Sequence, residues 1–414
     1  PYCARRARCA ALHLSLRCSL TLPTPPALAR AGNTFVSWLS APVPAGTVCG
    51  DLATTPCPTL AEGLAAAAPG STVYVTPGRF AGAGNVEVSF GGKAVTLQST
   101  NGRELTLVNA TDPVTGLKTR AFNFTSGEGR DSVLAGFSVT GGDAENGGCV
   151  IIERSAPTIR DSLFLGCNTT AGSARGGAIY AWNTPAPGPL IANSSFTFNW
   201  GVEGGAIFVG GETVPAAMEV AGCDFQWNIC ASPVGRGGAF AADTANFTIA
   251  DSIIENSIVG FGGGAVNLER ATGRVERSTL RNNTAASFAG AVQIFAASLT
   301  AVDSNFTGNR GFIFAGGVIV TSADYEAVNT RHDDNWGRVG GGGIKVVGGS
   351  CRLRGGSVSF NRADGYGGAF DVATGYGCCC ENCARAGDWG CYVPGLAAGG
   401  AANACIFKNK DLTI

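Results

Sequence analysis

Charge and long apolar runs are both scarce in this chain of 414 residues. Charged residues make up 14% of the sequence, well below the usual quarter. The 29 basic and 30 acidic residues give a net charge of -1, so no basic excess is present to neutralise phosphates, and we expect no nucleic-acid partner. The longest apolar run, Gly311 to Val320, is too short to cross a bilayer. We therefore expect no transmembrane segment.

Helical periodicity is missing as well. No stretch within residues 147–370 sustains the 3.6-residue apolar spacing of a helix. The 62 glycines follow no Gly-X-Y period, which excludes collagen. With 45% hydrophobic residues the chain is too apolar to be disordered, so a packed fold built from strands remains.

Cysteine is plentiful, with 16 residues, and this usage favours an oxidising compartment. Seven N-x-[ST] sequons point the same way, although a chain rich in Asn, Ser and Thr also produces sequons by chance. We predict an extracellular or cell-surface protein. The disulfide candidates are Cys49, Cys57, Cys223, Cys230, Cys378, Cys379, Cys380, Cys383, Cys391 and Cys405. The glycosylation candidates are Asn109, Asn123, Asn168, Asn193, Asn246, Asn282 and Asn305.

The first 48 residues have the order of a signal peptide. Basic Arg5, Arg6 and Arg8 precede the apolar stretch Ala10 to Leu16, and Ala29-Arg30-Ala31 resembles a cleavage site. A fragmentary or mistranslated leader is the alternative. We therefore expect residues 1–48 to be a poorly defined leader or linker.

A glycine-rich tetrad recurs through the second half of the chain and is the main feature of the sequence. Each copy has two small residues, usually both glycine, then a small and an apolar residue, and successive copies lie 25 to 33 residues apart. The copies are Gly176-Gly177-Ala178-Ile179, Gly204-Gly205-Ala206-Ile207, Gly237-Gly238-Ala239-Phe240, Gly263-Gly264-Ala265-Val266, Ala289-Gly290-Ala291-Val292, Gly316-Gly317-Val318-Ile319, Gly341-Gly342-Gly343-Ile344 and Gly367-Gly368-Ala369-Phe370, with a looser copy at Gly147-Gly148-Cys149-Val150.

A second motif, small-x-apolar-x-x-Asn, shares this period. Its asparagines are spaced 26 to 29 residues apart. They are Asn199, Asn228, Asn256, Asn283, Asn309, Asn335 and Asn361. The apolar members are Phe196, Phe225, Ile253, Leu280, Phe306 and Val358, and His332 takes this slot in one copy.

The repeat unit alternates between two faces, as a strand does, over four to six residues at a time. Gly, Asn and Asp separate these short strands, and stacking equivalent strands of successive units gives parallel sheets. The pattern predicts an all-β fold, a right-handed parallel β-helix solenoid of about nine to eleven coils. We expect the apolar member to point inward, the asparagine to form a ladder of turn hydrogen bonds between coils, and the glycines to turn the corners.

These motifs resemble those of the pectin-lyase-like superfamily of right-handed parallel β-helix proteins. The Gly-Gly-Ala-Ile and Phe-x-x-Asn repeats are similar to those of chlamydial polymorphic outer membrane proteins and of algal surface relatives. Residues Cys57 to Ala68 resemble the short amphipathic helix that caps such solenoids, and Pro69 to Gly78 resemble the strand after it. The resemblance implies a cap and first strand over residues 49–75 and a β-helix over residues 76–372.

Residues 373–414 leave the repeat and are rich in cysteine. We predict a disulfide-linked cap over the last coil, where a bare sheet edge would otherwise be exposed. Cys380, Cys383, Cys391 and Cys405 are the four cysteines that a zinc site would use, but their spacing matches no common finger.

Catalytic signatures of this fold are mostly missing from the sequence. It has no Gly-His-Gly motif, and His332, Asp333 and Asp334 are its only catalytic candidates. A hydrogen-bonded core histidine is the alternative interpretation of His332. We predict no cofactor and no metal; Ca²⁺ enters only if the protein is a lyase.

Two functions follow from the resemblance and from the scarcity of catalytic residues. The first is a non-enzymatic structural or adhesive protein of the extracellular space or cell surface, whose partners are glycans, matrix or other surface proteins. The alternative is a polysaccharide-active enzyme similar to the polyuronide lyases of this fold. Three or more carboxylates and an arginine converging in one groove would favour the enzyme.

Overall fold

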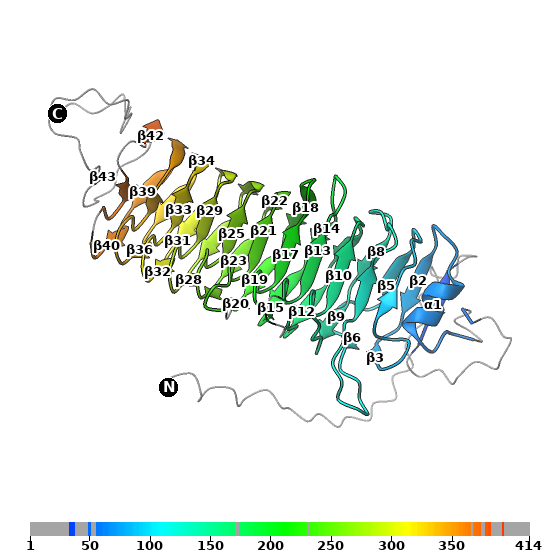
Figure 1. The fold of residues 1–414 in the computed structure, drawn as a ribbon. Helices are drawn as coiled ribbons and strands as arrows, with labels where there is room; N and C mark the ends of the chain where they lie inside the picture. Colours follow the sequence, from blue (N-terminus) through cyan, green and yellow to red (C-terminus); the bar gives the residue numbers. More distant parts are fainter. Residues whose placement is uncertain are drawn as a thin grey trace, which may run out of the picture. The chain divides into compact units, whose positions relative to one another are not determined.

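A computed structural model describes residues 33–37, 49–50, 55–169, 172, 174–230, 232–365, 367–373, 377–381 and 391–392. Within these ranges the chain forms a parallel β-solenoid of about eleven turns with almost no helix (Figure 1). The fold is therefore the all-β solenoid that the repeats predict. Each coil lies beside the coil that follows it in the sequence, so the colours of Figure 1 run in order along the stack.

The described strands form four parallel sheets, numbered in the order in which a coil visits them. Sheet 1 contains β1 (Thr34–Val36), β2 (Thr72–Val75), β5 (Thr96–Ser99), β8 (Val133–Ala135), β11 (Thr158–Arg160), β14 (Leu190–Ala192), β18 (Ala216–Ala221), β22 (Ala245–Ala250), β26 (Thr272–Glu276), β30 (Ser298–Val302), β34 (Ala323–Val328), β38 (Gly349–Arg354) and β42 (Gly377–Glu381). Sheet 2 contains β3 (Gly78–Ala81), β6 (Thr106–Asn109), β9 (Ser138–Thr140), β12 (Leu163–Leu165), β15 (Ser195–Thr197), β19 (Asp224–Gln226), β23 (Ile253–Glu255), β27 (Thr279–Arg281), β31 (Asn305–Thr307), β35 (Arg331–Asp333) and β39 (Ser357–Ser359).

The other two sheets complete each coil. Sheet 3 contains β16 (Trp200–Gly201), β20 (Ile229–Cys230), β24 (Ile258–Val259), β28 (Thr284–Ala285), β32 (Arg310–Gly311), β36 (Trp336–Gly337) and β40 (Arg362–Ala363). Sheet 4 contains β4 (Val88–Ser89), β7 (Phe122–Phe124), β10 (Val150–Glu153), β13 (Ile179–Trp182), β17 (Ile207–Gly210), β21 (Phe240–Asp243), β25 (Val266–Glu269), β29 (Val292–Phe295), β33 (Val318–Thr321), β37 (Ile344–Val346), β41 (Phe370–Val372) and β43 (Cys391–Tyr392).

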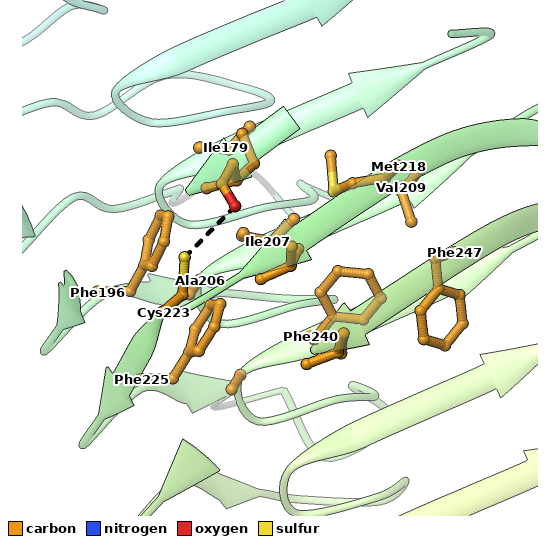
Figure 2. Close-up of a cluster of buried hydrophobic side chains, with 14 of the residues drawn as sticks. Ile179, Phe196, Ala206, Ile207, Val209, Met218, Cys223, Phe225, Phe240 and Phe247 are labelled. Atoms are coloured by element: carbon orange, nitrogen blue, oxygen red, sulfur yellow. Dashed lines mark hydrogen bonds between the residues drawn. The ribbon is translucent and has the colours of Figure 1, made fainter. Parts of the chain in front are cut away.

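Inward side chains stack on their equivalents in the next coil and form one continuous core (Figure 2). On sheet 2 the rings of Phe164 and Phe196 lie 5.0 Å apart, and those of Phe196 and Phe225 lie 4.7 Å apart. Phe306, in the same slot, is fully buried. Phe196, Phe225 and Phe306 are inward positions that the second motif predicts, and stacked aromatic pairs add to the stability gained from burial.

The two glycines of the tetrad have different physical roles. Gly204 has a φ of 65°, a left-handed conformation that residues with a Cβ adopt at a cost. Gly205 has no room for a side chain, because a Cβ there would collide with the carbonyl oxygen of Gly238 in the next coil. The tetrad therefore forms a corner at which the first glycine turns the chain and the second leaves room for the backbone of the neighbouring coil.

The predicted asparagine ladder is a chain of buried amide hydrogen bonds. Asn309 Nδ2 donates to Asn335 Oδ1 at 3.0 Å and to the Leu280 carbonyl at 2.9 Å. Asn335 Oδ1 also accepts from the backbone N–H of Asn309 at 3.0 Å. Each side chain thus satisfies two backbone groups of the preceding coil and bonds to the side-chain amide of the next coil. Equivalent amide pairs join Asn199 to Asn228, Asn283 to Asn309 and Asn335 to Asn361.

Asn256 was predicted in this ladder, and that assignment is wrong by one residue. Ser257 takes the buried slot, and its backbone N–H donates to Asn283 Oδ1 at 3.0 Å. Asn256 sits at the preceding corner with a φ of 55°. The motif could be aligned on either of two adjacent isoleucines. Ile254 is fully buried, whereas Ile253, the predicted inward residue, is 39% exposed.

The helix α1 (Leu60–Ala66) lies within the segment predicted to contain one. Thr59 is its N-cap, and the Thr59 hydroxyl accepts from the Glu62 backbone N–H. The helix contacts β1, β2 and β4. Strand β1 lies inside the segment that sequence analysis assigned to the leader, and it pairs in parallel with β2. No helix in the described ranges is long and apolar enough to cross a membrane.

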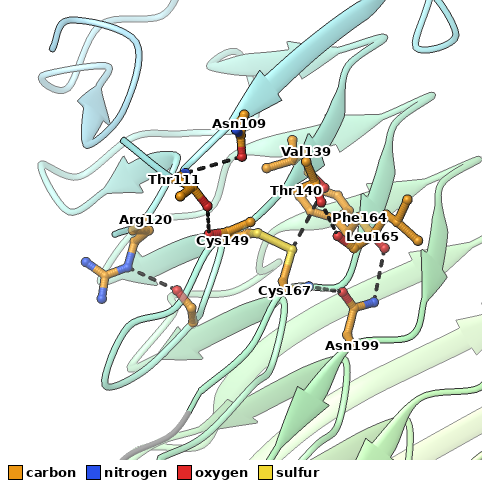
Figure 3. Close-up of a disulfide and its surroundings, with 12 residues drawn as sticks. Asn109, Thr111, Arg120, Val139, Thr140, Cys149, Phe164, Leu165, Cys167 and Asn199 are labelled. Atoms are coloured by element: carbon orange, nitrogen blue, oxygen red, sulfur yellow. Dashed lines mark hydrogen bonds between the residues drawn. A yellow bond between two sulfur atoms is a disulfide. The ribbon is translucent and has the colours of Figure 1, made fainter. Parts of the chain in front are cut away.

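Two disulfides join cysteines that both lie in the described part of the chain. Cys49 bonds to Cys57 with an S–S distance of 2.03 Å, as a pair of predicted candidates. Cys149 bonds to Cys167 (Figure 3), and neither of these was predicted to pair. The repeat contains a signal for this bond, because Cys149 replaces a tetrad alanine and Cys167 takes the ladder slot before Asn199, whose Oδ1 accepts from the Cys167 N–H.

Cys223 and Cys230, predicted as disulfide candidates, are instead free and buried. Cys223 packs in the main core, whereas Cys230 packs in a separate small cluster with Val259 and Ala285. Burial raises the pKa of both thiols to about 12, which keeps them protonated and unreactive. The side chains of the other candidates, which are Cys378, Cys379, Cys380, Cys383, Cys391 and Cys405, lie outside the described residues.

Replacing Asn309 by alanine tests the ladder. The change leaves the Asn283 backbone N–H and Nδ2 without their acceptor, so we expect the free energy of unfolding to fall by about 2–4 kcal/mol. Urea denaturation measures this value. The control is Asn305→Ala, because Asn305 is exposed four residues earlier, and we expect it to change stability by less than about 0.5 kcal/mol. Equal losses in both variants would contradict the ladder.

Candidate ligand-binding surface

One side chain of each coil points outward from sheet 3, directly after the ladder residue. The parallel register places these side chains beside one another on adjacent coils. We call this set the outer row. Its members are Trp200, Ile229, Ile258, Thr284, Arg310, Trp336 and Arg362. Because the buried ladder holds the preceding residue, the outer row is presented by a rigid backbone.

The first part of the outer row is apolar and exposed. Trp200 is 50% exposed and Ile258 is 43% exposed, with Ile229 between them. At the adjoining corner Phe198 and Trp227 are 57% and 46% exposed, and their rings stack at 6.5 Å. Both have a φ near 55°, a conformation that bulky residues rarely adopt. We call Phe198, Trp200, Trp227, Ile229 and Ile258 the aromatic ridge.

The last part of the outer row combines arginine with an aromatic ring. Trp336 lies between Arg310 and Arg362 in direct register. Its indole contacts the ring of Phe312 edge-on at 5.4 Å, and its Nε1–H donates to Asp364 Oδ1 at 3.0 Å. These side chains come from three coils, 26 residues apart, so only the coiled register brings them together.

A polar strip borders the aromatic ridge on sheet 2. Arg281 Nε donates to Glu255 Oε2 at 2.5 Å, and Gln226 Nε2 donates to Asp224 Oδ2 at 2.8 Å. Asp224 Oδ1 is buried without a hydrogen-bond partner. Burial, and then the nearby charge of Glu255, raise the pKa of Asp224. The strip holds two carboxylates, with Arg281 beside Glu255 and Arg103 near Asp224. This is one carboxylate fewer than the set that would favour an enzyme.

The three predicted catalytic candidates do not come together. His332 is fully buried in the inward slot of β35, beside the ring of Phe306. Asp333 lies on the outer face, where it accepts hydrogen bonds from the hydroxyls of Ser357 and Ser359. Asp334 is exposed at the corner, with a φ of 52°. His332 and Asp333 point to opposite faces because they are successive residues of a strand. Asp334 follows the end of β35, and its left-handed backbone turns the chain at the corner.

The core histidine has one defined polar partner. Tyr325 Oη and His332 Nε2 lie 2.7 Å apart, while His332 Nδ1 has no hydrogen bond of standard geometry. Burial lowers the pKa of His332 to about 3 and raises that of Tyr325. The imidazole is therefore neutral at physiological pH and closed off from any ligand on the surface.

The sequon asparagines differ in exposure. Asn246 and Asn305 are exposed, and the phenylalanines that follow them, Phe247 and Phe306, are buried. This matches the outward direction that strand alternation predicts for both sites. Asn193 and Asn282 are exposed at corners, Asn123 and Asn168 are half-buried, and Asn109 is buried.

A shallow groove lies at the corner between sheets 4 and 1. Arg270, Ser298 and Asp324 contribute its polar groups. Arg270 already pairs with both carboxylate oxygens of Asp243, and Ser350 donates to Asp324. The polar groups of the groove are thus largely engaged. Among the described residues no group of three or more His, Cys, Asp or Glu side chains is arranged to hold a metal ion.

Comparison with known families finds no family model that matches the chain. Comparison with curated proteins likewise finds no match. Functional inference therefore depends on the chemistry of the surface described above.

Acid sensitivity tests the buried state of His332. The unfolded histidine titrates near pH 6.5 and the native one near pH 3, so the unfolded state takes up the proton first as the pH falls. The contribution of the neutral ring to the free energy of unfolding should therefore be lost as the pH falls between these two values, by up to roughly 1.4 kcal/mol per pH unit. We expect His332→Phe to remove this component, measured as the difference in unfolding free energy between pH 6.5 and 4.5. Parallel pH profiles for the two proteins would contradict the buried neutral ring.

Proposed function

We propose that this chain is a non-enzymatic structural or adhesive protein of the extracellular space or cell surface, and that it binds glycans along the outer row. The aromatic ridge is the observation that carries the proposal. Exposed apolar patches on a soluble fold mark interaction sites, and here Phe198, Trp200 and Trp227 keep large rings at the surface. Matrix and other surface proteins are the remaining partners that this function includes.

The geometry of the outer row suits an extended polymer. Parallel strands lie about 4.8 Å apart, which is comparable to the length of one sugar in an extended polysaccharide. A chain running along the stack would therefore meet a new outer-row side chain at nearly every sugar. Aromatic rings stack on the apolar faces of sugars, while the neighbouring carboxylates and amides of the polar strip accept and donate hydrogen bonds.

We also propose the finer assignments that the repeats suggest. These are a right-handed coil, a capping role for α1, kinship with the pectin-lyase-like superfamily and with the polymorphic outer membrane repeats, and glycosylation of the exposed sequons. The two disulfides support an oxidising compartment. The exposure of Asn246 and Asn305 supports modification at those two sites.

The second candidate function, a polysaccharide-active enzyme, has one observation in its favour. Asp224 has a raised pKa and lies one coil from Glu255. A protonated and an ionised carboxyl near each other are the groups that acid–base cleavage of a glycosidic bond requires. The pairing of Glu255 with Arg281 argues against it, because that carboxylate is already engaged.

Substitution within the aromatic ridge tests glycan binding. We expect the full chain to bind members of an immobilised glycan panel, and the double variant Trp200→Ala, Trp227→Ala to bind about tenfold more weakly, because each ring contributes roughly 0.5–1.5 kcal/mol. The control is Phe295→Ala, since Phe295 is 42% exposed on sheet 4. Circular dichroism checks that the variants fold. Absence of binding to any glycan, or an equal loss in the control, would count against the proposal.

Cleavage assays test the enzyme candidate separately. Reducing-sugar and unsaturated-uronate assays on polygalacturonate, pectin and alginate, with and without Ca²⁺, should show no turnover. Turnover abolished by Asp224→Asn and Glu255→Gln would promote the enzyme. If Asp224 were the acid, activity would also fall as the pH rises through its raised pKa, because the acid must be protonated.

A further inference from the structure

The arginines near the end of the outer row have no partners of their own. Arg310, Arg338 and Arg362 are exposed, and their guanidinium groups form no hydrogen bond or ion pair within the described part of the chain. Two exposed arginines of an earlier coil behave differently: Arg277 pairs with Asp251 and Glu276, and Arg281 pairs with Glu255. Three guanidinium groups without a partner thus lie on three consecutive coils around Trp336.

These free arginines surround an aromatic platform. Arg310 and Arg362 flank Trp336 on the neighbouring strands. Arg338 follows Trp336 by two residues, and its backbone N–H donates to the Gly311 carbonyl of the coil that carries Arg310. We call Arg310, Phe312, Trp336, Arg338 and Arg362 the arginine–tryptophan patch. Two carboxylates border it, Asp334 and Asp364, and Asp364 holds the indole N–H.

We propose that the arginine–tryptophan patch binds a sulfated polysaccharide, with a sugar ring on Trp336 and sulfate groups on the flanking arginines. This inference rests on the proposed glycan-binding function and assigns its ligand class. Arginine at all three charged positions favours an oxyanion ligand, because the guanidinium fork donates two hydrogen bonds to one group. A sulfate ester has three equivalent oxygens around a tetrahedral sulfur, so it accepts hydrogen bonds from guanidinium groups that lie on different coils. A carboxylate accepts mainly within one plane.

The spacing of the patch fits such a chain. Arg310 and Arg362 are two strand spacings apart, roughly 10 Å, so a polymer that follows the outer row would place acidic groups of separate sugars over them. The ridge and the patch lie on the same row, with Thr284 between Ile258 and Arg310. One extended chain would therefore contact the apolar part with its ring faces and the basic part with its sulfates.

Binding to immobilised heparin over a series of NaCl concentrations tests the proposal with the full chain. We expect binding that weakens steeply as salt rises, because exposed charges are screened. The double variant Arg310→Ala, Arg362→Ala should bind at least tenfold more weakly and with a flatter salt dependence. The variant Trp336→Ala should lose affinity while keeping the salt dependence. The variant Arg310→Lys, Arg362→Lys should restore the salt dependence but only part of the affinity.

The matched control is Arg352→Ala, because Arg352 is another exposed arginine without an ion pair in the described ranges, and it lies on sheet 1. It should bind within twofold of wild type. Equal loss in the control, equal binding of desulfated heparin or polygalacturonate, or equal competition by polyglutamate would overturn the sulfate assignment. If heparin fails while neutral glycans still bind through Trp200 and Trp227, only this inference falls. If no glycan binds at all, the proposed function falls with it.

Discussion

Hydrogen bonds between equivalent residues of successive coils hold this structure together, and the composition of the core and of the surface both follow from them. Every strand pair in the four sheets is parallel, so each backbone group finds its partner one coil away. The asparagine ladder extends this rule to side chains, since each amide bonds to the backbone of the preceding coil and to the amide of the next one. A change at one ladder position therefore disturbs at least two coils.

The same register limits which side chains fit in the core. Inward slots are repeated in register, so the side chain at each level must match the levels above and below it. Phe196 and Phe225 satisfy this by stacking. His332 satisfies it by staying neutral, with its ring against Phe306 and one nitrogen bonded to Tyr325. Packing and hydrogen bonding in the core therefore account for the histidine at this position. Neither of its ring nitrogens reaches the surface.

Outward side chains lie in the same register as the inward ones, but they do not have to pack in the core. The outer row is free to vary from coil to coil, and it changes from apolar at Trp200 and Ile229 to basic at Arg310 and Arg362. The surface is rigid because the ladder residue precedes each of these positions. A solenoid of this kind presents a long regular face whose chemistry changes by one residue per coil.

The strands, their parallel stacking, the inward slots and most of the ladder could be predicted from the amino-acid sequence, because these features recur with the same period and each copy supports the others. The prediction was wrong at Asn256, because the motif could be aligned on either of two adjacent isoleucines. It was also wrong for Cys223 and Cys230, which are close in the sequence but pack in different clusters. Cys149 and Cys167 pair because the coil brings a corner slot to a ladder slot. The ladder period already places Arg310, Trp336 and Arg362 on adjacent coils. The folded structure was needed to show that both arginines stay exposed without an ion pair while Trp336 bonds to Asp364, because the turns between the strands decide which polar side chains meet.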